Sequence, residues 1–250
     1  MVRSKIVRMK DLVQSIRERF LFTMDRIASA ARTAARPAES VKLVVVTKAQ
    51  PLDVTQAAIE AGVKILGENY PEEGVTKIQS LPENSAVEWH MIGHVQSRKA
   101  ALVARYFNFM HSLDSVKLAR KLNGFCEQEA RALPVLLEFN VGEEETKGGW
   151  PALDEARWSE LLDEVSTVMA LKNLEVRGLM TMPPLGETAE FSRPFFQRLR
   201  RLQDFLTTQF PQSAWTELSM GTSADYEVAV EEGATLVRVG TAIVGERIYT

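Results

Sequence analysis

The stretch VKLVVVTKAQPLDVTQAAIEAGVKILGEN, residues 41–69, contains the pattern that decides the fold. It opens with the apolar run KLVVVTK, continues with the helix-like segment LDVTQAAIEAG, and returns to an apolar run in VKILGEN. Gly62 follows the helical part, where glycine suits the left-handed residue just beyond a helix C-terminus. A strand, a helix and a second strand in this order predict two parallel strands joined by a crossover helix.

The same alternation continues along the rest of the chain. Eight apolar runs can be counted, and they are KLVVVTK (42–48), VKILGEN (63–69), VEWHMIG (87–93), FNFMHSL (107–113), PVLLEFNV (134–141), LEVRGLMTM (174–182), WTELSMG (215–221) and TLVRVGT (235–241). Helix-like segments lie between them, and no linker-like stretch divides the units into groups. The pattern therefore predicts an α/β protein with a closed (β/α)8 TIM barrel, formed by a single domain that spans residues 1–250. A doubly wound open sheet is the alternative, but the sequence shows no position for its topological switch.

An amphipathic helix is predicted to precede the barrel over residues 8–35. Its apolar residues recur at spacings of three or four and form one stripe, which consists of Leu12, Ile16, Phe20, Met24, Ile27 and Ala31. Pro37 ends this pattern. Residues 1–40 are therefore expected to be an N-terminal helical segment packed on the barrel.

Composition and charge limit the classes of function. The chain has 250 residues, of which 45% are hydrophobic and 25% charged, as in an ordinary globular protein. Its net charge of -3 gives it no general attraction for nucleic acid or anionic membranes. The single cysteine, Cys126, excludes an internal disulfide framework and suits a reducing compartment. With no signal-like or membrane-spanning apolar stretch, a cytoplasmic protein without nucleic-acid or membrane partners is expected.

Lys48 stands at the end of the first predicted strand, where a parallel barrel carries its functional site. If side chains alternate along this strand, Val44, Val46 and Lys48 share one face, so the valines fill the barrel and Lys48 enters its upper mouth. A partly desolvated amine at this place can form a Schiff base with an aldehyde or ketone. By position alone, a solvated strand end explains the lysine equally well.

The last two predicted strands end in small polar residues. These residues offer hydroxyls, or let backbone N–H groups approach an anion, and they are Ser219, Gly221, Thr222, Ser223, Gly240 and Thr241. Barrels most often bind phosphate in the loops after the seventh and eighth strands, although each loop alone would also suit a helix cap. Arg238 shares parity with Leu236, so it is predicted to point inward and to meet a ligand or an acidic residue such as Glu138.

Several common functional motifs are absent. The sequence contains no Walker A loop, no G-x-G-x-x-G, no G-x-S-x-G and no H-E-x-x-H. The histidines His90, His94 and His111 do not have a metal-ligand spacing with nearby acids, so structural roles are expected for them. No metal site is predicted.

The longer motifs resemble those of one family. They occur in order from about residue 41 to 247, and they are VVVTKAQP, LGENYPEE, WHMIGHVQSRKA, MHSLDS, FNVGEEETKGG, RGLMTM and LSMGTSADYEVAVEEGATLVRVGTAIVGER. This combination is similar to the YggS/PROSC family of pyridoxal phosphate homeostasis proteins, and the last block is the most specific. The resemblance implies the fold-type III barrel found in the N-terminal domain of alanine racemase, and pyridoxal 5′-phosphate (PLP) as cofactor.

The resemblance also implies roles for individual residues. Lys48 would form the Schiff base with PLP. Arg238 would lie at the pyridine nitrogen, where an arginine leaves that nitrogen unprotonated and makes the ring a weaker electron sink. Asn69 and Met180 match positions that line the cofactor pocket. The phosphate would be held by the segments that contain Ser219, Gly221, Thr222, Ser223, Gly240 and Thr241.

The match to the family is not uniform. Some members carry a second lysine two residues beyond the Schiff-base lysine, where this chain has Gln50. Lys147, in contrast, matches a lysine that is often present in the family. The first forty residues match only as a leading helix, which is somewhat longer than expected.

The resemblance favours binding over catalysis. After the last predicted strand only AIVGERIYT remains, so the domain that supplies alanine racemase with its tyrosine base is not expected. The chain is therefore expected to be a monomeric, non-catalytic PLP-binding protein, without catalytic residues, that acts in intracellular PLP homeostasis. PLP-dependent apoenzymes are the partners that would receive the cofactor. Two alternatives remain open: a PLP-dependent amino-acid racemase with Lys48 as its single base, and a phosphate-binding aldolase without PLP.

Overall fold

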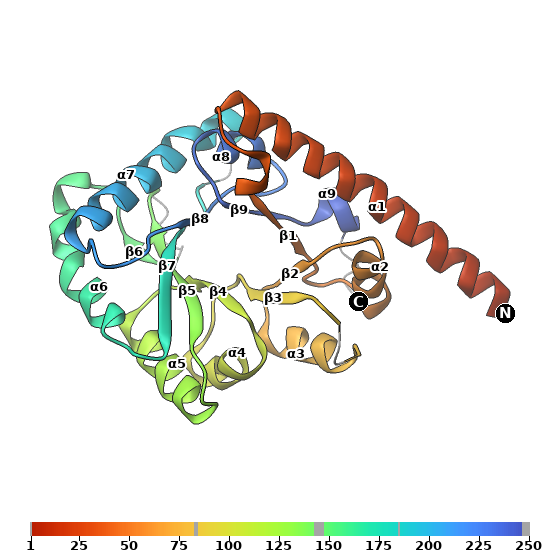
Figure 1. Cartoon of the computed structure of the whole chain (residues 1–250), viewed down its shortest axis with the longest axis horizontal. Coiled ribbons are helices and arrows are strands. Elements are labelled where there is room, and N and C mark those ends of the chain that lie inside the picture. Colours follow the sequence, from red (N-terminus) through yellow and green to blue (C-terminus); the bar gives the residue numbers. More distant parts are fainter. Residues whose placement is uncertain (1, 83–84, 143–147, 185, 247–250) are drawn as a thin grey trace.

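A closed ring of parallel strands forms the centre of the computed structural model, which describes residues 2–82, 85–142, 148–184 and 186–246 (Figure 1). The ring consists of β1 (Lys42–Val46), β2 (Ile65–Glu68), β3 (Glu88–Met91), β4 (Phe109–Leu113), β5 (Leu133–Asn140), β7 (Leu174–Met180), β8 (Glu217–Ser219) and β9 (Leu236–Val239). Parallel pairing of β4 with β5 and of β1 with β9 closes the ring. All eight predicted strands are therefore present, and the closed barrel is confirmed over the open sheet.

Helices connect the strands and surround the barrel (Figure 1). They are α2 (Leu52–Glu60), α3 (Pro71–Gln79), α4 (Ala100–Tyr106), α5 (Val116–Gln128), α6 (Leu162–Met169), α7 (Arg193–Gln209), α8 (Tyr226–Glu231) and α9 (Thr241–Val244), with 3-10 turns η1 (Ala38–Ser40), η2 (Ser97–Lys99), η3 (Glu155–Leu161) and η4 (Ala189–Ser192). Two details differ from the predicted pattern. The segment 154–170 begins as the 3-10 turn η3 before it becomes α-helical, and a two-residue strand β6 (Trp150–Pro151) pairs with β5.

The N-terminal helix α1 (Val2–Thr33) starts before the predicted residues 8–35 and ends two residues earlier. It ends because Ala35 takes a left-handed conformation with φ +54°, and the N–H of Arg36 bonds to the carbonyl of Ala31 at 2.8 Å. The guanidinium of Arg36 then donates to the carbonyls of Val230 and Ala234, at 2.7 and 2.9 Å. Helix α1 is thereby fastened to α8, and its N-terminal end projects past α2 (Figure 1).

Apolar side chains fill part of the barrel interior below its upper mouth. Val44, Leu136, Met180 and Leu236 form a buried cluster inside the ring. Gly67 gives this cluster room, because a Cβ at that position would lie 2.9 Å from Cγ1 of Val44. The strand alternation predicted for β1 is therefore observed: Val44 fills the barrel, and the residues after it on the same face lie higher, toward the mouth.

Candidate functional site

A cavity of about 470 Å³ opens at the carboxyl ends of the strands, where parallel barrels place their sites. Its size is in the usual range for small-molecule pockets. The described residues that line it are Val46, Lys48, Asn69, Ile92, Gly93, His94, Glu138, Gly148, Met182, Thr222, Ser223, Ala224, Arg238, Gly240 and Thr241. The fold therefore brings together seven of the ten residues that the sequence predicted for the site: Lys48, Asn69, Thr222, Ser223, Arg238, Gly240 and Thr241.

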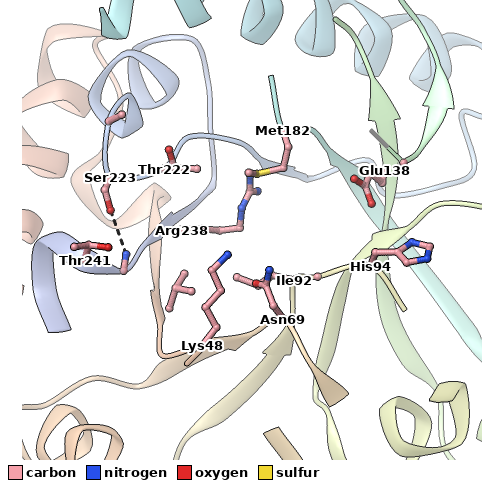
Figure 2. A pocket seen from close by; sticks show the side chains of 15 residues that line it. Lys48, Asn69, Ile92, His94, Glu138, Met182, Thr222, Ser223, Arg238 and Thr241 are labelled. Atoms are coloured by element: carbon pink, nitrogen blue, oxygen red, sulfur yellow. Dashed lines mark hydrogen bonds between the residues drawn. The ribbon is translucent and has the colours of Figure 1, made fainter. Parts of the chain in front are cut away.

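Lys48 is half-buried and is carried by the turn that follows β1. The N–H of Gln50 bonds to the carbonyl of Thr47 at 3.1 Å, which makes Lys48 and Ala49 the central residues of this turn. Figure 2 shows the amine of Lys48 extending into the cavity toward Arg238. The side chain of Lys48 therefore lines the cavity, as the strand alternation predicted.

One side of the cavity is rich in hydrogen-bond donors. Ser223 and Thr241 lie there together, and the N–H of Gly240 bonds to Oγ of Ser223 at 3.3 Å (Figure 2). Oδ1 of Asp225 accepts from the N–H and the hydroxyl of Thr222, at 2.7 and 3.0 Å. Asp225 thus braces the loop after β8 by binding Thr222, while the hydroxyl of Ser223, which accepts from Gly240, can still donate to an anion.

Arg238 points from β9 into the same cavity, as predicted, although only 4% of its surface is exposed. It donates to Oγ of Ser219, and to the carbonyl of Thr181 and the sulfur of Met182, both at 2.9 Å. Burial lowers the pKa of Arg238 to about 10, against the opposing effect of the Glu138 and Asp225 carboxylates. The guanidinium therefore remains a cation at neutral pH. The hydrogen-bond partners of the guanidinium are therefore Ser219, Thr181 and Met182, while the Glu138 carboxylate interacts with it electrostatically across the cavity.

A chain of buried side chains continues from Arg238 down through the barrel. Oγ of Ser219 lies 2.8 Å from Nδ1 of His111, and Nε2 of His111 lies 2.9 Å from Nδ1 of His90. Nε2 of His90 is 3.3 Å from a carboxylate oxygen of Glu88. Burial lowers the pKa of both histidines, so both are neutral at pH 7. One proton arrangement then satisfies every atom: Ser219 donates to His111, His111 to His90, and His90 to Glu88.

Glu138 lies on the far side of the cavity from Ser223 in Figure 2, beside His94. Burial first, and the neighbouring Asp114 second, raise the pKa of Glu138 to about 7, although Arg238 and His94 oppose this shift. His94 in turn contacts Asp114, with Nδ1 and Oδ2 2.7 Å apart. At neutral pH the Glu138 carboxyl can therefore either accept or donate a proton.

Three predicted site residues lie outside the described lining of the cavity. Met180 belongs to the apolar cluster below the cavity, and Met182, two residues further along on the same face, is the side chain that reaches the cavity. Ser219 lies one layer deeper, under Arg238. Gly221 has φ +89° within the loop, and its carbonyl accepts a hydrogen bond from the backbone N–H of Arg238 at 3.1 Å.

Lys147 lies outside the described residues. Within the described ranges, no group of three or more His, Cys, Asp and Glu side chains is placed to hold a metal ion.

A lysine amine, a buried arginine and neutral hydrogen-bond donors surround one cavity, so fold and site define a (β/α)8 protein with a barrel-mouth pocket suited to a small anion. The family model for the N-terminal domain of alanine racemase matches residues 23–248. The chain is 40% identical, over 86% of its length and 90% of the relative, to the pyridoxal phosphate homeostasis protein of Vibrio alginolyticus. The corresponding protein of Aquifex aeolicus is 38% identical over 93% of this chain and 98% of its own. The chain therefore belongs to the pyridoxal phosphate homeostasis protein family, whose barrel is the alanine racemase N-terminal domain.

Solved structures agree with this assignment. PipY of Synechococcus elongatus, in the structure with PLP bound, has a TM-score of 0.75 and 34% identity over 89% of this chain and 99% of its own. An alanine racemase of Clostridium difficile has a TM-score of 0.66 and 14% identity over 92% of this chain and 56% of its own. At 14% identity, the likeness to this alanine racemase shows the fold alone. Among the helices of the described ranges, none combines the length and apolar character that a membrane crossing requires.

Proposed function

We propose that this chain binds PLP, tethered covalently at Lys48, and holds it for intracellular PLP homeostasis without robust catalysis. The observation that carries the proposal is that Lys48, Arg238 and the donors beside Ser223 face one cavity. The names of the relatives and the PLP-bound structure of PipY support the same cofactor.

The donor set fits the chemistry of PLP at each end of the cavity. The phosphate is an anion, and the hydroxyls of Ser223 and Thr241, with the backbone of Gly240, are suited to hold it. The pyridine nitrogen is an acceptor, and Arg238 carries only donors. When bound, the cofactor supplies an aldehyde that condenses reversibly with a primary amine, as well as a ring that can accept electrons. Lys48 provides that amine.

Arg238 explains why holding is favoured over chemistry. A guanidinium donates its N–H groups and keeps its proton, so it leaves a ring nitrogen unprotonated and limits electron withdrawal by the ring. Ser219 and the carbonyl of Thr181 fix the guanidinium in place, which makes this arrangement permanent. We extend the proposal to a single-domain, monomeric, cytoplasmic protein that passes PLP to apoenzymes; the continuous ring of eight parallel strands supports the single domain.

The deciding experiment is an absorbance spectrum of the purified protein with added PLP, before and after borohydride. The wild type should develop a visible band that borohydride removes while fixing the cofactor on Lys48, as detected by mass spectrometry of peptides. Lys48→Ala should remain folded by circular dichroism and lose the band. Lys64→Ala, which removes an exposed lysine just before β2, should behave like the wild type. A colourless wild type that ignores PLP would refute the proposal.

A racemase-like activity is the second candidate, and Glu138 is the observation that favours it. With a pKa of about 7 and a place in the cavity lining, this carboxyl could exchange a proton in addition to Lys48. Solvent deuterium should then enter the α-carbon of an amino acid at ordinary enzyme turnover, roughly 1 to 1000 per second. Uptake at that rate would replace the homeostasis proposal with an enzyme. The visible band itself excludes an aldolase without PLP.

A further inference from the structure

A network of buried charges lies directly behind Lys48, on the outer side of the barrel wall between β1, β2 and α3. The side chain of Lys77 is 6% exposed and that of Glu68 is fully buried. Nζ of Lys77 donates to Oε1 of Glu68 at 2.8 Å, to Oε1 of Glu73 at 2.6 Å and to the carbonyl of Thr47 at 2.7 Å. An ammonium group has three N–H donors, so each of them has a partner in this network.

This network holds the backbone on both sides of Lys48. Thr47, the residue before it, donates its hydroxyl to Oε1 of Glu68 at 2.6 Å and gives its carbonyl to Lys77. Ala49, the residue after it, donates its N–H to Oε1 of Glu73 at 2.8 Å. Lys48 is therefore the one residue of this tripeptide whose side chain faces the cavity, while both neighbours are bound from behind.

The turn that carries Lys48 has a conformation that requires such support. Ala49 has φ +55°, a left-handed conformation that the Cβ of a non-glycine residue disfavours. Nε2 of Gln50 binds the turn from the other side, since it donates to the carbonyls of Gly245 and Glu246, each at 3.1 Å. At the position where some family members have a second lysine, this chain therefore has a further brace for the turn.

Stability alone is a poor explanation for the buried charges. Taking a lysine and a carboxylate out of water opposes much of their mutual attraction, and an apolar pair of similar size often stabilises a fold equally well. Oε2 of Glu68 has no hydrogen-bond partner among the described residues, and burial raises the pKa of this carboxyl despite Lys77. The network is costly to bury and is directed at one turn.

We propose that Glu68, Glu73 and Lys77 are positioning residues for Lys48. By fixing the carbonyl of Thr47 and the N–H of Ala49, they hold the turn so that the amine enters the cavity facing Arg238. The consequence for cofactor binding rests on the proposed function, but the placement of the amine does not. Disturbing the network should therefore change the environment of Lys48 even when PLP is absent.

Helix α3 offers a matched pair of variants for the test. Glu73→Ala removes the acceptor for the Ala49 N–H, and its side chain is partly exposed, which favours folding of the variant. Glu72→Ala makes the same change one residue away, where the carboxylate pairs with Lys99 at 2.6 Å. Glu73→Gln is the conservative variant, because its amide oxygen can still accept from Ala49. Thermal unfolding of all three reports any loss of stability.

Two readouts follow the amine itself. In the cofactor-free protein, acylation of Lys48 is compared with that of exposed Lys64 in the same molecule by mass spectrometry. In Glu73→Ala the ratio of the Lys48 acylation rate to the Lys64 acylation rate should move toward one by at least about fivefold. This is the size of effect expected when the hydrogen bond between the Ala49 N–H and the Glu73 carboxylate is lost. The visible band with PLP should form more slowly by a similar factor. Glu72→Ala should leave both unchanged, and Glu73→Gln should restore most of each.

The outcomes separate the two proposals. If the wild type forms no visible band, the proposed function fails, while the acylation comparison still decides the positioning role. If Glu73→Ala lowers stability but leaves both the acylation rate and the band formation as in Glu72→Ala, the network is only structural and the positioning role is refuted.

Discussion

His111 and Ser219 contact each other inside the barrel, with Nδ1 and Oγ 2.8 Å apart, and the same hydroxyl accepts a hydrogen bond from Arg238. A side chain of β4 therefore reaches across the ring to support, through β8, the arginine on β9. The cavity floor is polar and fully paired at this point, although it lies above an apolar cluster.

Ser219→Ala should lower the free energy of unfolding by roughly 1–3 kcal/mol, because it leaves Nδ1 of His111 and an N–H of Arg238 without their buried partner. Urea denaturation of the cofactor-free protein measures this. Ser223→Ala removes an exposed hydroxyl from the same cavity and should change stability by less than about 0.5 kcal/mol. Equal losses in the two variants would contradict the buried role of Ser219.

Arg238→Gln should weaken PLP binding about ten- to hundredfold, because hydrogen bonds to charged groups contribute more than neutral ones. Equilibrium titration of the protein with PLP gives the dissociation constant. Arg177→Gln on β7 is a matched control, since Arg177 pairs with Glu175 in the exposed part of the strand. An unchanged affinity in Arg238→Gln would show that the guanidinium does not touch the bound cofactor.

Glu138 should make stability depend on pH. Its pKa is raised from 4.5 to about 7 in the folded protein, so the folded state holds this proton more tightly than the unfolded chain. The group therefore favours folding below about pH 4.5, and that contribution is lost as the pH rises through 7, by roughly 1–3 kcal/mol. Denaturation of Glu138→Gln from pH 4 to 8 should lack this component, whereas Glu39→Gln, at an exposed position, should keep it. A difference between Glu138→Gln and wild type that stays constant with pH would be inconsistent with the raised pKa.

Two glycines should respond to alanine in opposite directions. Gly221 has φ +89°, and a Cβ there would lie 2.5 Å from Cβ of Ala229, so Gly221→Ala should cost about 2 kcal/mol or more. Gly124 lies within α5 with nothing within 4 Å of such a Cβ, so Gly124→Ala should gain about 0.5–1 kcal/mol. Thermal unfolding distinguishes them, and a loss in both would count against the helix assignment at Gly124.

Much of this architecture could be predicted from local patterns. The β1 run and the LDVTQAAIEAG segment each carry their own periodicity, and counting eight such units was enough to predict the closed barrel. Strand parity placed Lys48 and Arg238 at the mouth because alternation along a strand is a local property. The C-terminal end of α1 was harder to predict from the sequence, because it depends on the left-handed Ala35 and on the docking of Arg36 against α8.

The remaining part of the site depends on contacts between distant segments. Nothing near Thr47 in the sequence indicates that Lys77 and Glu73 bind its turn, although their spacing of four residues on one helix is a recognisable ion-pair signal. Met182 in place of Met180 is a matter of depth in the barrel, which parity alone does not determine. The chain from Ser219 through His111 to His90 joins three strands and could not be read from any one of them.

The pairing of β1 with β9 has a consequence for how the protein is made. Lys48 emerges from the ribosome well before Ser223, Arg238 and Thr241 do. A nascent chain therefore carries the amine of Lys48 before it has the residues proposed to bind an anion. The ring cannot close until β9 has left the ribosome and can pair with β1. Capture of the ligand should therefore report that the ring of strands has closed.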